Sequence, residues 1–247
     1  MRPGIKLVVA SSVALVMLPG LAASAAPADP KDLKQVLQQL DAAATNFHST
    51  SADVEFETVQ SDPVNEKDID KGAVEYKRTG KSFQMIVHFR DEAIDVQNGK
   101  PARFKPVPKD LVVSGGKVTL YEKLPNQVHL YSASRFESYM ILGFGASGTQ
   151  LAEKWDIAYL GTESLLDGKT SVKTAKLELV AKDPDVRKMF PKVTIWVDPL
   201  RAVSLKQIFD EGHGQSRTSY YSNIKLNPTL PDSDFTINTD SKTQIVK

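Results

Sequence analysis

The pattern of apolar and polar positions changes period near residue 51. Apolar residues recur at helical spacing over residues 33–47, and Asp29-Pro30 ahead of them is typical of a helix start, so this stretch predicts an amphipathic helix. Its apolar face consists of Leu33, Val36, Leu37, Leu40, Ala44 and Phe47. Beyond residue 51 apolar side chains alternate with acidic ones, and residues 52–58, which include Phe56, predict a half-buried strand.

A period of two continues through most of the remaining chain. We expect strands at residues 72–79, 82–89, 93–97, 111–113, 118–122 and 127–131, then at 155–162, 169–181, 192–197, 202–210, 215–224 and 235–238. Residues 62–71 predict a polar loop, and the tail from about residue 239 is polar and predicted to fray. Because turn pairs such as Asn98-Gly99 make the connections short, we expect antiparallel neighbours in one mainly β domain, residues 26–247.

Residues 134–144 depart from the strand pattern. The stretch predicts a short apolar helix through Phe136, Tyr139, Met140, Ile141 and Phe144. Gly143, Gly145 and Gly148 end it, and we interpret them as a hinge. The three glycines also match a dinucleotide-binding fingerprint, but that motif must follow a strand in a parallel unit, and here it follows a predicted helix.

The first residues are typical of a secretory signal peptide. Arg2 and Lys6 precede an uncharged apolar run at residues 7–18, and Ala23-Ser24-Ala25 fits the small-residue cleavage rule, so we expect cleavage after Ala25. The run is shorter than the ~18 residues that span a bilayer. Cleavage would change the formal net charge from +1 to −1. The mature chain is thus expected to be exported and soluble, in the periplasm of a cell with two membranes.

Composition excludes several kinds of chemistry. With no cysteine, the chain has no disulfides, thiol nucleophile or thiolate metal site. A net charge near zero gives no electrostatic footprint for nucleic acid. The four histidines are far apart, and Asp210, Glu211 and His213 fall at a predicted hairpin tip, so we expect no metal and no cofactor. No local catalytic constellation occurs and we expect no enzyme, although acids from distant strands can meet in a fold.

Large apolar residues are abundant for a sheet with one solvated face. Adjacent apolar residues occur in strands such as 83–89 and 193–197, and the stretch 134–144 adds more. An ordinary core would absorb most of them. A curved sheet with helices at its mouth could instead enclose a cavity for an apolar ligand. Composition leaves both interpretations open.

Three segments resemble the outer-membrane lipoprotein carrier family, the LolA-like proteins. The first is residues 72–78, a strand with Tyr76 that ends in Lys77-Arg78, and the second is residues 111–121, two strands around a Gly-Lys turn. The third is the order of elements from Asp183-Pro184 to Phe235. The resemblance covers about residues 32–238. The stretch 91–106 is an apparent insertion relative to the family.

The resemblance implies a fold and a function. The fold is an unclosed antiparallel β-barrel in which N-terminal and central helices form a lid over an apolar cavity. The function is to take acyl chains of lipoproteins from an inner-membrane releasing complex and deliver them to an outer-membrane acceptor, as a monomer. Arg78 occupies the position whose arginine is thought to bond the closed lid.

Candidate residues for contact with the lipid follow from the same resemblance. They lie in the cavity or the lid: Leu37, Leu40, Phe47, Phe56, Tyr76, Phe83, Met85, Tyr121, Phe136, Tyr139, Met140, Phe144 and Trp196. The same half-barrel is also compatible with a lipid sensor, or with a glycolipid- or phospholipid-binding envelope protein, that regulates or serves a partner.

Overall fold

The computed structural model describes residues 31–61, 65–80, 82–96, 100, 102–132, 139 and 142–246. The expected signal peptide lies outside the described residues, as do the candidates Phe136 and Met140. Most of the expected central helix also lies outside them, so the structure gives no comparison for that element.

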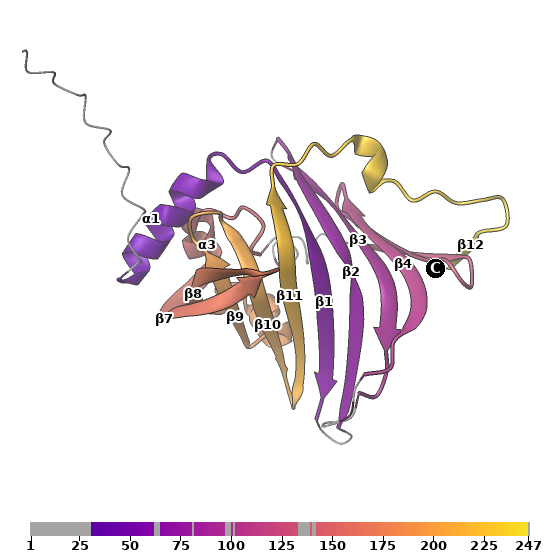
Figure 1. The fold of residues 1–247 in the computed structure, drawn as a ribbon, viewed down its shortest axis with the longest axis horizontal. Coiled ribbons are helices and arrows are strands. Elements are labelled where there is room, and N and C mark those ends of the chain that lie inside the picture. The colour runs from indigo at the N-terminus through magenta and orange to yellow at the C-terminus, as the bar shows by residue number, and fades with distance from the viewer. Residues whose placement is uncertain are drawn as a thin grey trace, which may run out of the picture.

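Twelve strands form one sheet in the order β12-β6-β5-β4-β3-β2-β1-β11-β10-β9-β8-β7 (Figure 1). Their bounds are β1 (Ser49–Gln60), β2 (Glu66–Thr79), β3 (Ser82–Ala93), β4 (Lys105–Ser114), β5 (Lys117–Glu122), β6 (Gln127–Ser132), β7 (Trp155–Asp167), β8 (Thr170–Ala181), β9 (Lys192–Asp198), β10 (Val203–Gly212), β11 (Gln215–Leu226) and β12 (Gln244–Val246). Neighbours pair antiparallel except β12, which pairs parallel with β6. Within the described chain β7 and β12 end the sheet as separate edges, so the barrel is unclosed, as expected.

Side-chain caps mark where the helices begin. The α1 helix (Leu33–Ala44) begins after Asp32, whose side chain accepts from the Gln35 backbone, so Asp29-Pro30 was the wrong start signal. The α3 helix (Gly148–Lys154) begins with a capping box between Ser147 and Gln150. Gly148 therefore opens a helix, whereas the sequence led us to expect that it ends one. Asp183 caps the short α4 helix (Pro184–Met189).

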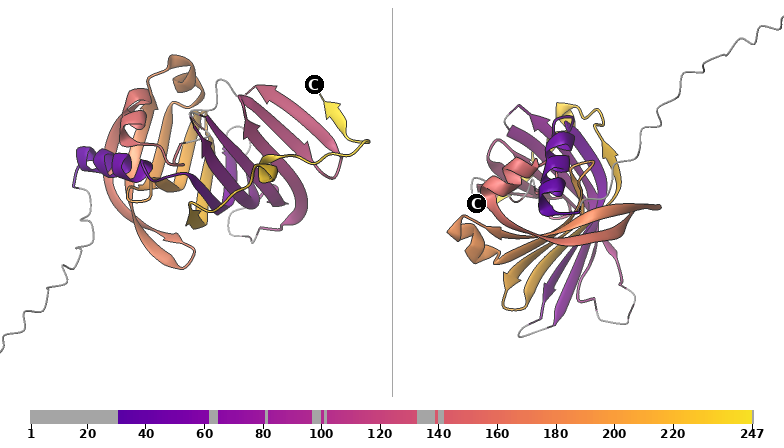
Figure 2. Two further views of the ribbon diagram at one scale, coloured as in Figure 1. Left: turned by 90° about the horizontal axis from the view of Figure 1, so that it is seen from above. Right: turned by 90° about the vertical axis from the view of Figure 1, so that its left-hand side faces the viewer.

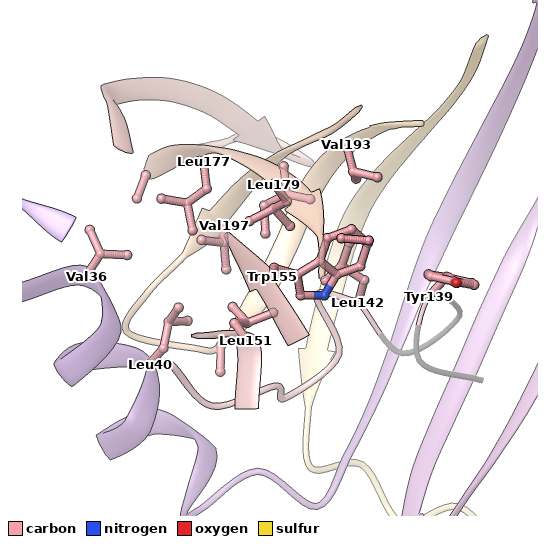
Figure 3. Packing of buried hydrophobic residues seen from close by; sticks show 14 of the residues in the cluster. Val36, Leu40, Tyr139, Leu142, Leu151, Trp155, Leu177, Leu179, Val193 and Val197 are labelled. Carbon is pink, nitrogen blue, oxygen red and sulfur yellow. The ribbon is translucent and has the colours of Figure 1, made fainter. Parts of the chain in front are cut away.

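The helices α1 and α3 lie side by side over one end of the concave face (Figures 1 and 2). Val36 and Leu40 of α1 and Leu151 of α3 pack against Leu177 and Val197 of β8 and β9, as Figure 3 shows. These side chains are at most 4% exposed. Each contributes about 1.5–3 kcal/mol by leaving water. This core fixes α1 on β7–β10.

Three segments differ from the pattern-based expectation. The predicted polar loop at 62–71 is partly strand, because β2 begins at Glu66. Lys67 and Lys71 pair with Glu57 and Glu55 of β1, whereas Asp70 pairs in register with Phe56 on the concave side. Because polar residues occupy both faces of this part of β2, the strand looks like a loop in sequence.

The other differences are at residues 93–97 and in the C-terminal segment. Ala93 ends β3, and no separate strand follows it among the described residues before β4. At the expected strand 235–238 the chain forms a 3-10 turn, η1 (Asp232–Phe235), and Phe235 packs on Ile86 and Val112 across the convex face. The tail that we expected to fray adds β12 to the β6 edge.

Candidate functional site

A cavity of about 530 Å³ lies on the concave side of the sheet. This volume is within the range of about 300–1,000 Å³ usual for small-molecule sites. Its wall is mostly apolar and aromatic, and it consists of Phe56, Val74, Met85, Val87, Phe89, Leu111, Val118, Tyr131, Tyr139, Phe144, Phe190, Phe209 and Tyr221, with Glu57, Thr58, Asp70, Ser132, Gln207, Arg217 and Ser219.

Alternation along neighbouring strands builds this wall. Met85 and Val87, two residues apart on β3, point to the same face, and Met85 pairs in register with Tyr76 and Val113. Leu111 on β4 and Val118 on β5 continue the apolar surface toward the β6 edge. Because each strand contributes every second residue, the convex face of the same strands can be polar.

Charged side chains gather where β1, β2 and β11 lie together. Asp70 pairs in register with Phe56, and Arg217 pairs in register with Thr58. Both charges have partners: Lys109 lies 3.2 Å from Asp70, and Glu211 lies 2.7 Å from Arg217. Burial alone would lower the pKa of Lys109, but the carboxylates of Asp70 and Glu92 outweigh it and raise that pKa. This part of the wall is therefore polar but internally ion-paired.

Aromatic rings form the part of the wall near α4. Phe190 lies edge-on to Phe209 at 5.2 Å and to Tyr139 at 5.5 Å between ring centroids. Phe144 stacks on Tyr76 at 5.5 Å and meets Tyr221 edge-on at 5.2 Å. Burial raises the pKa of Tyr221 to about 12, although a hydrogen bond with Ser219 opposes that rise.

Arg78 connects β2 to the segments that cover the concave face. Its guanidinium donates to the carbonyl oxygens of Ala44, at the last residue of α1, and of Gly145, at 3.2 and 2.7 Å. The guanidinium also lies 5.6 Å from the centre of the Phe47 ring. This is the position that a residue holding a lid would take. Its role in opening stays a prediction.

The structure divides the candidate residues into three groups. Phe56, Met85, Tyr139 and Phe144 line the cavity. Leu37 and Leu40 pack in the core under α1, and Phe47, Tyr76 and Phe83 pack in a second core beside the cavity. No described residue of α1 lines the cavity, so α1 covers the concave face without forming the cavity wall.

Tyr121 and Trp196 lie on the convex face, so neither lines the cavity. Tyr121 pairs in register with Asp110, one residue from the cavity-lining Leu111, and its hydroxyl bonds Asn126 at 3.0 Å. Trp196 lies between Ile195 and Val197, which both point to the concave core. Its indole donates to Glu163 at 2.6 Å. The aromatic character of both residues suggested a cavity, but alternation along the strand places them outside.

Several lining residues were missed by the sequence analysis. They include Val74, Val87, Phe89, Leu111, Val118, Phe190, Phe209 and Tyr221. Extending a period of two from Phe56 and Met85 along each strand would have found those on the same strands. Phe190 follows α4, and no periodic signal places it opposite Tyr139.

The glycines that we interpreted as a hinge have a packing role in the structure. A Cβ on Gly145 would lie 2.1 Å from the Phe47 ring, and one on Gly148 would lie 2.2 Å from the Leu37 carbonyl oxygen. Gly143 and Gly145 also have φ of +82° and +71°. These positions therefore let the chain pass close to α1 and Phe47.

Two other features bear on the kind of site. Within the described ranges there is no group of three or more His, Asp or Glu side chains that could hold a metal ion. None of the described helices is long and apolar enough to cross a membrane.

Comparisons with known proteins place this geometry among solved structures. No family model and no curated protein matches the chain. An uncharacterised conserved protein from Thermus thermophilus is similar at 14% identity over 86% of this chain and 97% of that chain, with a TM-score of 0.47. A domain described as outer membrane lipoprotein-sorting, from Vibrio parahaemolyticus, is similar at 14% identity over 83% of this chain and 96% of that chain, with a TM-score of 0.41.

A third similar structure is a complex of two proteins. MucB, solved with MucA from Pseudomonas aeruginosa, is similar at 11% identity over 82% of this chain and 61% of that chain, with a TM-score of 0.43. These are likenesses of fold. The described part of the chain forms an unclosed sheet of twelve strands with helices over its concave face, which is the fold class that its sequence led us to expect.

Proposed function

We propose that the protein is an exported carrier that holds acyl chains of lipoproteins, or of other lipids, in the concave cavity. The observation that carries the proposal is the wall itself, in which side chains from eight adjacent strands, β6 to β10 in the order of the sheet, and from Phe190 face one space of about 530 Å³. Burial of hydrocarbon contributes about 0.8 kcal/mol per CH₂. An apolar cavity of this size therefore supplies affinity without covalent chemistry.

The proposed carrier cycle requires a change in the segments that cover the concave face. The Arg78 hydrogen bonds to Ala44 and Gly145 join the sheet to both covering segments. Breaking them would remove the bonds of β2 to both segments at once, while the core under α1 stays packed. A competing apolar site on an acceptor would then draw the acyl chain away, because binding follows the equilibrium between covered and open states.

The location and partners follow from the sequence and complete the proposal. A signal peptide at residues 1–25 would send the chain to the periplasm, with cleavage after Ala25. A releasing complex at the inner membrane would supply the acylated cargo. An acceptor at the outer membrane would take it. The proposal assigns the protein no catalytic residue. In the proposed cycle the protein only binds the acylated cargo and transfers it.

Uptake of a labelled acyl ligand tests the proposal directly. The mature protein is purified without detergent, its extract is analysed by mass spectrometry, and uptake of a fluorescent diacyl lipopeptide is measured. We expect bound acylated material, and saturable uptake with transfer to acceptor vesicles. A protein that is empty and takes up no lipopeptide would contradict the proposal. Uptake without transfer, together with capture of a partner, would indicate a lipid sensor instead.

A pair of adjacent substitutions makes this test specific to the cavity. Val118→Trp places a large ring into the cavity from β5, whereas Lys117→Trp places the same ring at an exposed position next to it. We expect Val118→Trp to reduce the amount of lipopeptide bound and Lys117→Trp to leave it unchanged. Equal losses in both variants would show that the probe binds the surface.

A further inference from the structure

The side chain of Tyr139 lines the cavity, and its hydroxyl is a buried donor without an acceptor in the described part of the chain. The side chain is 6% exposed, and its oxygen has no hydrogen-bond partner among the described residues. The ring is held edge-on against Trp155 and Phe190, at centroid distances of 6.1 and 5.5 Å. Figure 3 shows Tyr139 beyond Leu142, on the far side of the core cluster from α1. Packing thus fixes the ring and leaves the hydroxyl unpaired.

Neighbouring polar groups in the described wall have partners within the protein. Gln207 donates from Nε2 to the Leu142 carbonyl oxygen, and the Tyr221 hydroxyl hydrogen-bonds Ser219. Ser204 also has a buried hydroxyl without a partner, but its side chain does not line the cavity. Because buried polar groups are nearly always hydrogen-bonded, an unpaired donor beside a ligand-sized cavity is a group that an acceptor on a ligand can satisfy.

The charges around Tyr139 restrict the chemistry of that acceptor. Burial, with the carboxylates of Asp183 and Asp185 at the start of α4, raises the pKa of Tyr139 to about 12. The phenol therefore keeps its proton at physiological pH and can donate. The same two carboxylates repel an anion, so a neutral carbonyl oxygen suits the position better than a free carboxylate or a phosphate does.

We propose that Tyr139 donates a hydrogen bond to a neutral ester or amide carbonyl of an acylated ligand whose hydrocarbon lies in the cavity. The inference rests on the proposed function and adds to it a ligand class, the acyl ester or amide. It also gives the acyl chain of the ligand a preferred position. The carbonyl lies beside the Tyr139–Phe190 rings, and the hydrocarbon lies along Phe209, Met85 and Leu111.

Two probes of equal length and different acceptor capacity test this inference. Methyl hexadecanoate has a carbonyl, and octadecane has none. Each is delivered from cyclodextrin to displace a fluorescent hydrocarbon from the full mature protein. We expect the Tyr139→Phe variant to bind the ester about three- to tenfold more weakly and the alkane unchanged. Tyr121→Phe is the matched control, because Tyr121 lies on the convex face and its hydroxyl already bonds Asn126.

The outcomes separate this inference from the proposed function. If both probes bind and Tyr139→Phe affects neither, the hydrogen bond is refuted while the cavity stands. If neither probe displaces the fluorophore from the wild-type protein, the proposed function and this inference both fail. An infrared spectrum gives a second check. The band of a ¹³C-labelled ester carbonyl should lie at lower frequency in the wild-type protein than in the Tyr139→Phe variant, and equal frequencies would overturn the inference.

Discussion

Arg78 and Gly145 are 67 residues apart in sequence, yet the Arg78 guanidinium donates to the Gly145 carbonyl oxygen at 2.7 Å. The same guanidinium donates to the carbonyl oxygen of Ala44, where a cation is favoured because the helix dipole of α1 leaves its C-terminal end negative. One side chain on β2 thus holds both covering segments. Any movement of these segments away from the sheet has to break these bonds.

Replacing Arg78 with leucine tests that restraint. We expect the Arg78→Leu variant to lose about 1–3 kcal/mol of stability, since two half-buried carbonyls lose charge-assisted bonds. Hydrogen exchange at the Gly145 amide, which bonds Ala202, should become faster, and a bound acyl probe should dissociate faster. Arg90→Leu is the control, because Arg90 is an exposed arginine on β3 that bonds a carbonyl oxygen of the sheet, that of Gly72. Unchanged exchange and dissociation in Arg78→Leu would show that the bonds restrain nothing.

Gly145 and Gly80 provide a test of close packing. Both have positive φ, +71° and +60°, so alanine costs about 1–2 kcal/mol of backbone strain at either position. A Cβ at Gly145 would also collide with the Phe47 ring, whereas nothing lies within 4 Å at Gly80. We expect Gly145→Ala to lower the free energy of unfolding in urea by about 1–3 kcal/mol more than Gly80→Ala. Equal losses would mean that Phe47 moves aside freely.

Trp196 should matter for stability and not for binding. Its ring lies between the ammonium groups of Lys176 and Lys206, at 4.9 and 4.7 Å, on the convex face. We expect Trp196→Ala to cost about 3–5 kcal/mol in urea unfolding while the folded fraction binds acyl probes normally. Phe209→Ala, which enlarges the cavity, should weaken binding of the same probe. Weaker binding by folded Trp196→Ala would place a ligand contact on the convex face.

Asp110 should make the protein sensitive to acid. Burial alone would raise its pKa, but hydrogen bonds with His88 and Lys123 outweigh burial and hold that pKa below its ordinary value of 3.8. A depressed pKa stabilises the fold above the unfolded-state value, and this stabilisation is lost as the pH falls through the folded-state value. In urea titrations below about pH 4, stability should therefore fall less steeply in Asp110→Asn than in the wild-type protein. Parallel slopes in the two proteins would contradict the assignment.

The sequence by itself determined the elements whose period is uniform. Residues 33–44 repeat at helical spacing and form α1, and the alternating segments at 118–122, 127–131 and 192–197 correspond to β5, β6 and β9 within one residue at each end. The local sequence is enough to predict these elements, because the side-chain period follows from backbone geometry. The α3 helix was also readable from its Ser147–Gln150 capping box, although we took that stretch for a hinge.

Only the tertiary structure decided which apolar residues face the cavity. Trp196 and Phe209 are both large and buried at least in part, but the order of the strands and their register set one on the convex face and the other in the cavity. Contacts such as Arg78 with Gly145, or Tyr139 with Phe190, join segments that are distant in sequence. Hydrophobic runs in the sequence indicate that their residues are buried. The direction in which each side chain points, and what it meets there, depends on strand pairing that no local pattern contains.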